Sequence, residues 1–320
     1  MLDIIAIGNA TMDVFVHVHP RVFKGAIGFV PGSKVEVEDI DFFTGGGASN
    51  VAVGLSRLGL KTGIIAMLGN DESASAIIDE LKKEKVSTSL ISFSSKNRTA
   101  YSVILTGFHR DRVVLTYSGA VKELAQGDAI KLGKLDSKWI YVSSFHSPSN
   151  VLKKIFSHAR EKGIKIAYNP GMQELKEGLH KFSEIAENTD ILLMNSSEAL
   201  TLTGSADIER NLHSLSKIAA IAVITEGPHG VHATDGNYIY FKKPFDVKVL
   251  DTTGAGDAFN SGFIGAIANG KTVEAAIDWG TANSNSVIQY LGTKNILLTK
   301  GGIAKMLKKY SSVKTSKKKI

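Results

Sequence analysis

The residues best suited to chemistry lie at 251–259, where the chain reads DTTGAGDAF. The tripeptide Gly254-Ala255-Gly256 directly precedes a stretch with helical spacing. Such a turn directs backbone amides at an anion, and the positive end of the following helix strengthens the attraction. Asp257 lies where the turn enters the helix, so the motif alone leaves two roles open, a reactive carboxylate or a helix cap. As a dinucleotide fingerprint it is poor, because Phe259 stands in place of the third glycine.

A second glycine cluster, GGG at 45–47, precedes another predicted helix and is followed by Asn50. Successive glycines allow a ligand to approach the backbone closely, and the Asn50 side chain offers donors and acceptors. A flexible hinge is the alternative interpretation. Asp13 lies beyond the first predicted strand, where its carboxylate is able to accept hydrogen bonds from the hydroxyls of a polyol.

Polar residues also follow the apolar strands predicted at 191–194 and 221–224. The first strand leads into Asn195 and Glu198, and the second into the turn TEGPHG at 225–230. In α/β folds this end of a strand faces the crevice that binds ligands. Glu198 is therefore a candidate to hold Mg²⁺ through water, with Asn195 at a phosphate, although such a pair alone more often caps a helix. The turn is able to lie against a nucleotide.

One motif is misleading. Residues 265–272, GAIANGKT, match the P-loop pattern, but a P-loop follows a buried strand and opens a helix. Here residues 258–268 have small and apolar side chains at helical spacing, and Gly270 resembles a helix C-cap. We therefore reject a P-loop.

The elements that must position these motifs alternate between short apolar strands and amphipathic helices. The predicted strands are 4–6, 62–67, 139–142, 164–168, 191–194 and 221–225, and the predicted helices include 48–58, 73–83, 150–162 and 197–202. This alternation predicts an α/β fold with a mostly parallel sheet covered on both faces. Segments 14–43 and 99–116 do not follow this alternation of strands and helices. We interpret them as an antiparallel excursion from the main sheet that forms a lid. With no linker or repeat, residues 1–320 are expected to form one domain.

Composition excludes several classes of protein. The chain has 320 residues and no Cys, which rules out disulfides, thiol catalysis and thiolate metal sites. No apolar run approaches the roughly 18–20 residues that span a bilayer, and the N-terminus resembles a buried strand rather than a signal peptide. We expect a cytoplasmic protein without a membrane partner. The net charge of +7 equals the seven lysines of segment 304–320, so we expect a solvated basic tail rather than a nucleic-acid-binding face.

Taken together, these motifs resemble the ribokinase family, the PfkB-type carbohydrate kinases. The resemblance runs from about residue 3 to residue 300, and it follows the family's order from Gly8 and Asp13 through GGGASN, NSSE and TEGPHG to DTTGAGD. It implies a three-layer α/β/α domain with a small β-sheet lid. It also implies transfer of the γ-phosphoryl group of ATP to a primary hydroxyl of a sugar.

The resemblance assigns a role to each motif. Asp257 would be the general base, and the amides of Gly254, Ala255, Gly256 and Asp257 would form an anion hole. The acceptor would be bound by Asp13, Gly45, Gly46 and Asn50. The nucleotide site would comprise Asn195, Thr225, Gly227, Gly230 and Asn283, with Glu198 organising Mg²⁺. Asp251 and Thr253 match a monovalent-cation loop that carbonyls of 288–293 would complete, so a K⁺ requirement stays open. No residue adjacent in sequence would raise the pKa of Asp257.

The chain departs from typical ribokinases where substrate identity is decided. Thr11 stands where they have Asn, and residues 142–146, VSSFH, lack their Glu. A nucleoside acceptor stays open, because Phe15, Phe145 or Tyr101 could stack on a base. A sugar phosphate would use Arg98, Arg110 or Arg112, and a non-catalytic sugar-binding protein is the third alternative. The lid edge is also a candidate homodimer surface.

Overall fold

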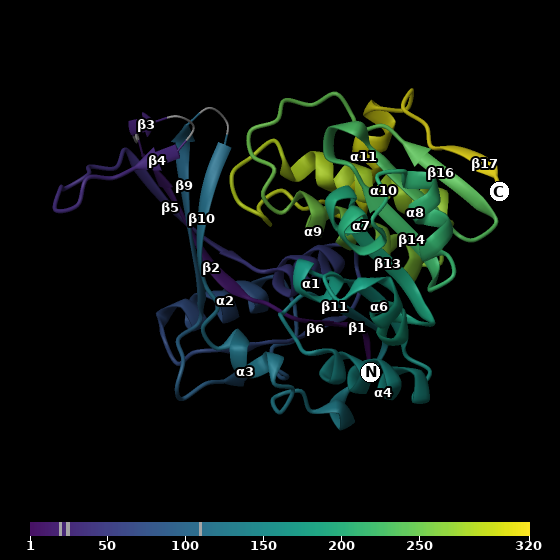
Figure 1. Cartoon of the computed structure of the whole chain (residues 1–320), viewed down its shortest axis with the longest axis horizontal. Helices are drawn as coiled ribbons and strands as arrows, with labels where there is room; N and C mark the ends of the chain where they lie inside the picture. Colours follow the sequence, from purple (N-terminus) through teal and green to yellow (C-terminus); the bar gives the residue numbers. More distant parts are fainter. Residues whose placement is uncertain (19–20, 24–25, 109–110) are drawn as a thin grey trace.

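The central feature of the protein is a large sheet with helices on both faces (Figure 1). The structure, a computed structural model, describes residues 1–18, 21–23, 26–108 and 111–320. Within those ranges the sheet has nine strands in the order β17-β16-β15-β14-β13-β12-β11-β1-β6. Their bounds are β1 Leu2–Ile7, β6 Thr62–Ile65, β11 Ser137–Ser143, β12 Lys165–Asn169, β13 Thr189–Asn195, β14 Ala219–Thr225, β15 Val231–Thr234, β16 Tyr238–Lys242 and β17 Ser316–Lys319.

Neighbouring strands from β6 to β14 pair in parallel, whereas β14 to β17 form an antiparallel edge. Successive side chains of β1 enter different cores, because strand residues alternate between faces. Ile5 and Ile7 pack among α3 to α8, and Ile4 and Ala6 pack among α1, α2, α9 and α10. The result is the predicted three-layer α/β/α arrangement.

The helices that form the two outer layers lie close to where the sequence pattern places them. Their bounds are α1 Gly47–Arg57, α2 Glu72–Lys83, α3 Val121–Ala125, α4 Ser149–Glu161, α5 Met172–Leu175, α6 Gly178–Ala186, α7 Ser196–Thr203, α8 Ile208–Leu215, α9 Ala255–Ala268, α10 Val273–Val287 and α11 Lys300–Lys309. Gly270 has φ +73° and its amide donates to Ile267 O just past the end of α9. The P-loop match is therefore a helix end.

A smaller sheet extends from one side of the main body (Figure 1). Its strands, in the order β10-β9-β2-β5, are β10 Asp111–Tyr117, β9 Ala100–Phe108, β2 Thr11–His17 and β5 Asp39–Gly45. Two short pairs accompany the sheets, β3 Arg21–Phe23 with β4 Ala26–Gly28 and β7 Met67–Leu68 with β8 Ser92–Phe93.

The prediction that this excursion is antiparallel is wrong at its centre. The β2–β9 pair is parallel, from Thr11 beside Ala100 to His17 beside Thr106. A parallel pair needs a long crossover. Here α1, β6 and α2 supply it, and they return the chain so that β9 leaves the main sheet in the same direction as β2.

The prediction of a solvated tail is also wrong for its backbone. Residues 300–309 form α11, and β17 pairs with β16 along four residues. Exposed lysines of β17 reach Glu274 and Glu209, with Lys317 Nζ 2.8 Å from Glu274 Oε1. Next to this edge the Lys242 side chain is only 2% exposed, and its Nζ contacts Asp278 Oδ1 at 2.9 Å and Val313 O at 2.5 Å.

This edge generates a stability prediction. Lys242→Met should lower the free energy of unfolding by about 2 kcal/mol, because it strips a buried ion pair whose remaining partner, Asp278, is partly solvated. Lys317→Met, on the paired strand, removes an exposed ion pair and should have a smaller effect. Urea denaturation of both variants measures the difference. Equal losses of stability would contradict the account.

Candidate functional site

The turn into α9 separates two cavities. Thr253, Gly254 and Asp257 line one, and Ala255 and Gly256 line the other. Gly254 is the N-cap of α9 with φ +78°, and a Cβ there would lie 2.7 Å from Cβ of Thr293, so this position requires glycine. The turn therefore brings a helix N-terminus to the boundary between two spaces.

The amides at this N-terminus are not equivalent. The Ala255 amide donates to Thr252 O at 3.2 Å, whereas the amides of Gly256 and Asp257 have no backbone acceptor in the described part of the chain. The first amides of a helix carry its partial positive charge. Gly256 and Asp257 are thus the groups best able to bind an anion here, and the Ala255 amide is already engaged.

The first cavity, of about 290 Å³, lies between the small sheet and the α/β body; we name it the acceptor-side cavity. Its lining includes Asn9, Thr11, Asp13, Gly46, Asn50, Tyr101, Ser102, Thr116, His146, Thr253, Gly254, Asp257 and Thr293.

Three predicted residues, Asp13, Gly46 and Asn50, line the acceptor-side cavity together. Gly45 lies beside them, because a Cβ there would overlap the Asp13 carboxylate. Thr11 Oγ1 donates to Asp13 Oδ1 at 3.0 Å, which gives the residue that replaces Asn a direct contact with this carboxylate. Burial raises the pKa of Asp13.

Asp257 faces the same cavity from α9. Asn50 Nδ2 donates to Asp257 Oδ2 at 2.7 Å, and Asp257 makes no capping bond, so the capping alternative does not apply. Burial, assisted by the negative charge of Asp13, raises the pKa of Asp257, while the Asn50 hydrogen bond and Lys294 oppose that rise. No sequence neighbour of Asp257 raises this pKa; both causes arise from folding, which the sequence-based expectation did not include.

The sequence prediction gives no side-chain role to two adjacent residues of this site, Thr293 and Lys294. Thr293 Oγ1 donates to Asn50 Oδ1 at 2.9 Å. The Lys294 side chain, 2% exposed, lies behind the cavity with its Nζ 3.0 Å from both Ser49 Oγ and Glu80 Oε2. No local pattern distinguishes Lys294 from the surface lysines, because only the packing of α1, α2 and the loop after α10 buries it.

The second cavity, of about 390 Å³, lies at the carboxyl ends of β13 and β14; we name it the nucleotide-side cavity. It brings together four predicted residues, Asn195, Thr225, Gly227 and Gly230. Further lining comes from Ser196, Ser197, Glu226, Val231, Lys242, Pro244, Ala255, Gly256, Phe259, Thr281, Ser284 and Asn285.

Asn195 and Glu198 form a capping box at the start of α7. The Glu198 amide donates to Asn195 Oδ1 at 2.9 Å, and Glu198 Oε2 accepts from the Asn195 amide at 2.8 Å. The helix cap is therefore present, and Glu198 does not itself line the nucleotide-side cavity, although Asn195, Ser196 and Ser197 beside it do. Burial, together with the charge of Glu174, raises the pKa of Glu198.

The prediction that Asn283 lines the nucleotide site is wrong. Its side chain is 0% exposed, and it donates to Ala258 O at 3.0 Å and Ser261 Oγ at 2.9 Å while accepting from the Leu298 amide at 2.8 Å. Its side-chain amide is thus consumed in joining α10 to α9 and to the loop before α11. Thr281, Ser284 and Asn285 of the same helix reach the cavity instead.

Asp251 and Thr253 come together in the loop before α9. Asp251 Oδ1 accepts from the Thr253 amide at 3.0 Å and from Thr253 Oγ1 at 2.8 Å, and Arg112 Nη1 lies 3.4 Å away. Asp251 Oδ2 is buried with no hydrogen-bond partner in the described part of the chain. An unsatisfied buried carboxylate oxygen fits a bound cation.

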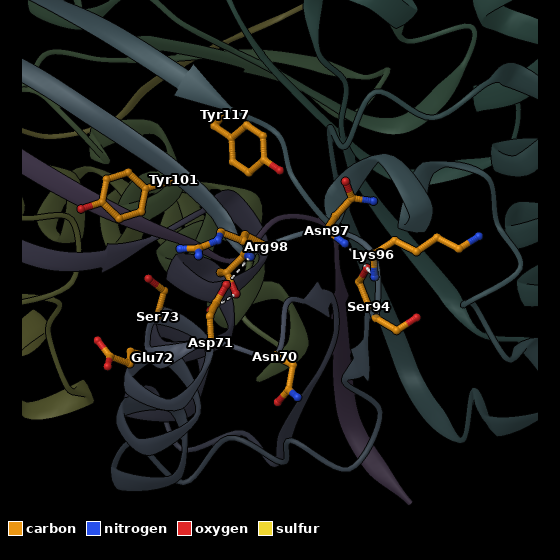
Figure 2. Close-up of a pocket in the computed structure, with 12 residues that line it drawn as sticks. Asn70, Asp71, Glu72, Ser73, Ser94, Lys96, Asn97, Arg98, Tyr101 and Tyr117 are labelled. Atoms are coloured by element: carbon orange, nitrogen blue, oxygen red, sulfur yellow. Dashed lines mark hydrogen bonds between the residues drawn. The ribbon is translucent and has the colours of Figure 1, made fainter.

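A third cavity, larger than these two at about 770 Å³, lies around the N-terminus of α2 (Figure 2). Its Asp71 carboxylate is committed to the fold, since it accepts from the Ala74 amide and from the Thr99 amide and hydroxyl. Tyr101 and Tyr117 line this cavity and also the acceptor-side cavity. This third cavity therefore adjoins the candidate site, but neither Asp257 nor the N-terminus of α9 lines it.

The structure places the remaining aromatic and arginine candidates for acceptor binding in different parts of the molecule. Among the three aromatic residues considered for stacking, only Tyr101 lines a cavity, whereas Phe15 and Phe145 are core residues. Arg98 lies in the large cavity (Figure 2), and Arg112 contacts the Asp251 loop. Arg110 lies outside the described residues.

None of the helices that the structure describes is long and apolar enough to cross a bilayer. Nor do three or more His, Asp or Glu side chains cluster as metal ligands anywhere in the described ranges.

Comparison with known proteins agrees with this geometry. Residues 1–300 match the profile of the pfkB family carbohydrate kinases. An uncharacterized sugar kinase of Archaeoglobus fulgidus is 30% identical over 69% of this chain and 89% of its own length.

Two solved structures share the fold. The Methanocaldococcus jannaschii nucleoside kinase, an archaeal member of the ribokinase family, aligns with a TM-score of 0.80 at 22% identity over 97% of this chain and 99% of its own. A putative ribokinase II of E. coli, in complex with ATP and Mg²⁺, aligns with a TM-score of 0.82 at 20% identity over 97% and 100%. The matched family spans nearly the whole described chain, and the chain therefore belongs to the pfkB family of carbohydrate kinases, as a phosphotransferase with an alcohol group as acceptor.

Proposed function

We propose that this protein transfers the γ-phosphoryl group of ATP to a primary hydroxyl of a sugar. One observation carries the proposal: the N-terminus of α9 lies between the two cavities. Its Asp257 side chain faces the acceptor-side cavity, and the free amide end of the helix faces the nucleotide-side cavity. Phosphoryl transfer needs in-line positioning of donor and acceptor and a group that stabilises charge on the transferred phosphoryl. This geometry supplies both at one place.

On the acceptor side, Asp257 takes the proton of the attacking hydroxyl. Its Oδ2 is held by Asn50, and Oδ1 has no hydrogen-bond donor in the described part of the chain. Because burial raises the pKa of Asp257, the ionised carboxylate is a stronger base than an exposed aspartate. Asp13 and the unpartnered, buried Asn9 Oδ1 provide acceptors for further hydroxyls, which favours a polyhydroxylated ligand.

On the donor side, Thr225, Gly227 and Gly230 would line the nucleotide. The amides of Gly256 and Asp257 would bind the transferred phosphoryl group as an anion hole, with Gly254 permitting the turn. Glu198, with Asn195, would hold Mg²⁺, which supplies neutralisation of phosphate charge when bound. The residues fit, because kinase-type Mg²⁺ sites use one or two carboxylates together with substrate phosphates.

A nucleoside acceptor is the second candidate. It is favoured by Tyr101 and Tyr117, which line the acceptor-side cavity and continue into the larger one, and by the archaeal nucleoside kinase of the same fold. Aromatic faces at a cavity wall suit a base. A non-catalytic sugar-binding role would leave the half-buried Asp257 and the free amides of α9 without a use.

We further propose that the small sheet is a lid and a dimer surface. Its apolar side chains Ile40, Phe42, Val113 and Leu115 are exposed on one face, and a second copy of the chain would cover them. A lid above the acceptor-side cavity would exclude water from the transferred phosphoryl group.

Asp257→Asn tests the base directly. The variant keeps the shape of the side chain but cannot accept the proton, so turnover should fall by about 10²- to 10⁴-fold. ATP consumption with Mg²⁺, measured over sugars, sugar phosphates and nucleosides, checks this and ranks the acceptors. The exposed Asp128→Asn serves as the matched control. Turnover retained in Asp257→Asn would remove Asp257 as the base.

Glu198→Gln should raise the Mg²⁺ concentration needed for half-maximal activity. Glutamine preserves the capping bond to the Asn195 amide but loses the charge, so helix α7 should stay intact. A Mg²⁺ titration of activity beside the exposed control Glu161→Gln gives the comparison. An unchanged Mg²⁺ requirement would exclude Glu198 from this role.

The unpartnered Asp251 Oδ2 supports a monovalent-cation site with Thr253. Activity should therefore increase when K⁺ replaces tetramethylammonium, and Asp251→Asn should lose that response. Rates that are equal in the two salts for the unaltered protein would contradict a cation at this loop.

A further inference from the structure

The loop after α10 returns to the acceptor-side cavity and places Thr293 against Asn50. Both side chains are buried, at 4% and 3% exposure. Thr293 Oγ1 donates to Asn50 Oδ1 at 2.9 Å, and Asn50 Nδ2 donates to Asp257 Oδ2 at 2.7 Å. Residues from three separate segments thus form one directed chain of hydrogen bonds that ends on the Asp257 carboxylate.

The direction of this chain matters because a carboxamide has unlike ends. Rotating the Asn50 amide by half a turn would bring its carbonyl oxygen against the Asp257 carboxylate, where two acceptors would repel each other. The Thr293 hydroxyl favours the observed orientation, since it gives the carbonyl oxygen a donor on the opposite side. It therefore acts on Asp257 through Asn50.

The two branches of the Thr293 side chain have different neighbours. The hydroxyl lies 2.9 Å from Asn50 Oδ1 and, more distantly, 3.5 Å from Thr44 O. Cβ and the methyl group fill the space beside Gly254, where they would lie 2.7 and 2.9 Å from a Cβ added to that glycine. Valine would preserve the packing and remove the hydroxyl, and serine would do the reverse. The chain thus offers a matched pair of substitutions.

The loop itself has other anchors. Lys294 Nζ donates to Ser49 Oγ at 3.0 Å, and Arg57 Nη1 donates to Lys294 O and Leu297 O, each at 2.9 Å. These contacts hold the loop on α1 without the Thr293 hydroxyl. Loss of that hydroxyl should therefore leave the backbone in place.

We propose that Thr293 is a positioning residue for phosphoryl transfer, whose hydroxyl orients the Asn50 amide so that Asp257 keeps one carboxylate oxygen free for the acceptor hydroxyl. The inference rests on the proposed function, in which Asp257 is the base. It adds a residue of the acceptor-side cavity wall whose hydroxyl acts on Asp257 through Asn50.

A pH dependence follows from the same contacts. The Asn50 hydrogen bond lowers the pKa of Asp257 against the opposing effect of burial, so its loss should raise that pKa. The acid limb of kcat/KM, where Asp257 becomes protonated, should then move to higher pH. The other titratable groups facing this region are Asp13, Lys294, Tyr101, Tyr117, Tyr141 and His146, and the Thr293 variants leave all of them unchanged.

The experiment compares Thr293→Val with Thr293→Ser, each alone and combined with Asn50→Ala, using the best acceptor of the panel. Thr293→Val should lower kcat about three- to tenfold, the range for one lost hydrogen bond, leave KM for ATP unchanged and shift the acid limb upward. Thr293→Ser should behave like the unaltered protein. In the Asn50→Ala background, Thr293→Val should have no further effect.

Three results would overturn the inference: unaltered kinetics in Thr293→Val, equal losses in the valine and serine variants, or an undiminished loss in the Asn50→Ala background. If Thr293→Val does not fold, Thr293→Ala replaces it, because alanine also lacks the hydroxyl. Asp257→Asn in the same assay separates the two proposals. Retained turnover there refutes the base, whereas lost turnover with normal Thr293→Val kinetics refutes only the role of Thr293.

Discussion

The Asp257 carboxylate is half-buried at the N-terminus of α9, and the rest of the site is arranged to support its negative charge. Burying a carboxylate is costly unless hydrogen bonds and opposite charge compensate it. Asn50 supplies the hydrogen bond, Lys294 the nearest positive charge and the helix N-terminus a favourable dipole. Burial and the second carboxylate, Asp13, act against them and raise the pKa of Asp257, which makes it a more basic group than an exposed aspartate.

The fold brings these groups together because the strands from β6 to β14 are parallel. Their carboxyl ends lie at one edge of the sheet, where β13 leads into Asn195 and β14 ends at Thr225. Helices α1 and α9 pack together on one face and direct their N-termini to the same region. The smaller sheet closes the acceptor side with residues of β2, β9 and β10.

Much of this arrangement was predictable from the sequence, because it depends on local patterns. Apolar strands alternating with amphipathic helices gave the layered fold, and glycines before a helix marked the α9 turn. Asn283 was predicted incorrectly, because its sequence position does not reveal that its amide is consumed between α10 and α9. Thr293 and Lys294 were missed for a related reason, since only long-range packing gives them their partners. The parallel β2–β9 pair likewise depends on a crossover that no short pattern records.

The most direct test of the central claim is a crystal structure with Mg²⁺ and a non-hydrolysable ATP analogue. The account predicts the base and sugar of the analogue in the nucleotide-side cavity, with a terminal phosphate oxygen about 3 Å from the amides of Gly256 and Asp257. It would be contradicted by an analogue bound in the larger cavity at α2, or by a terminal phosphate directed away from the N-terminus of α9.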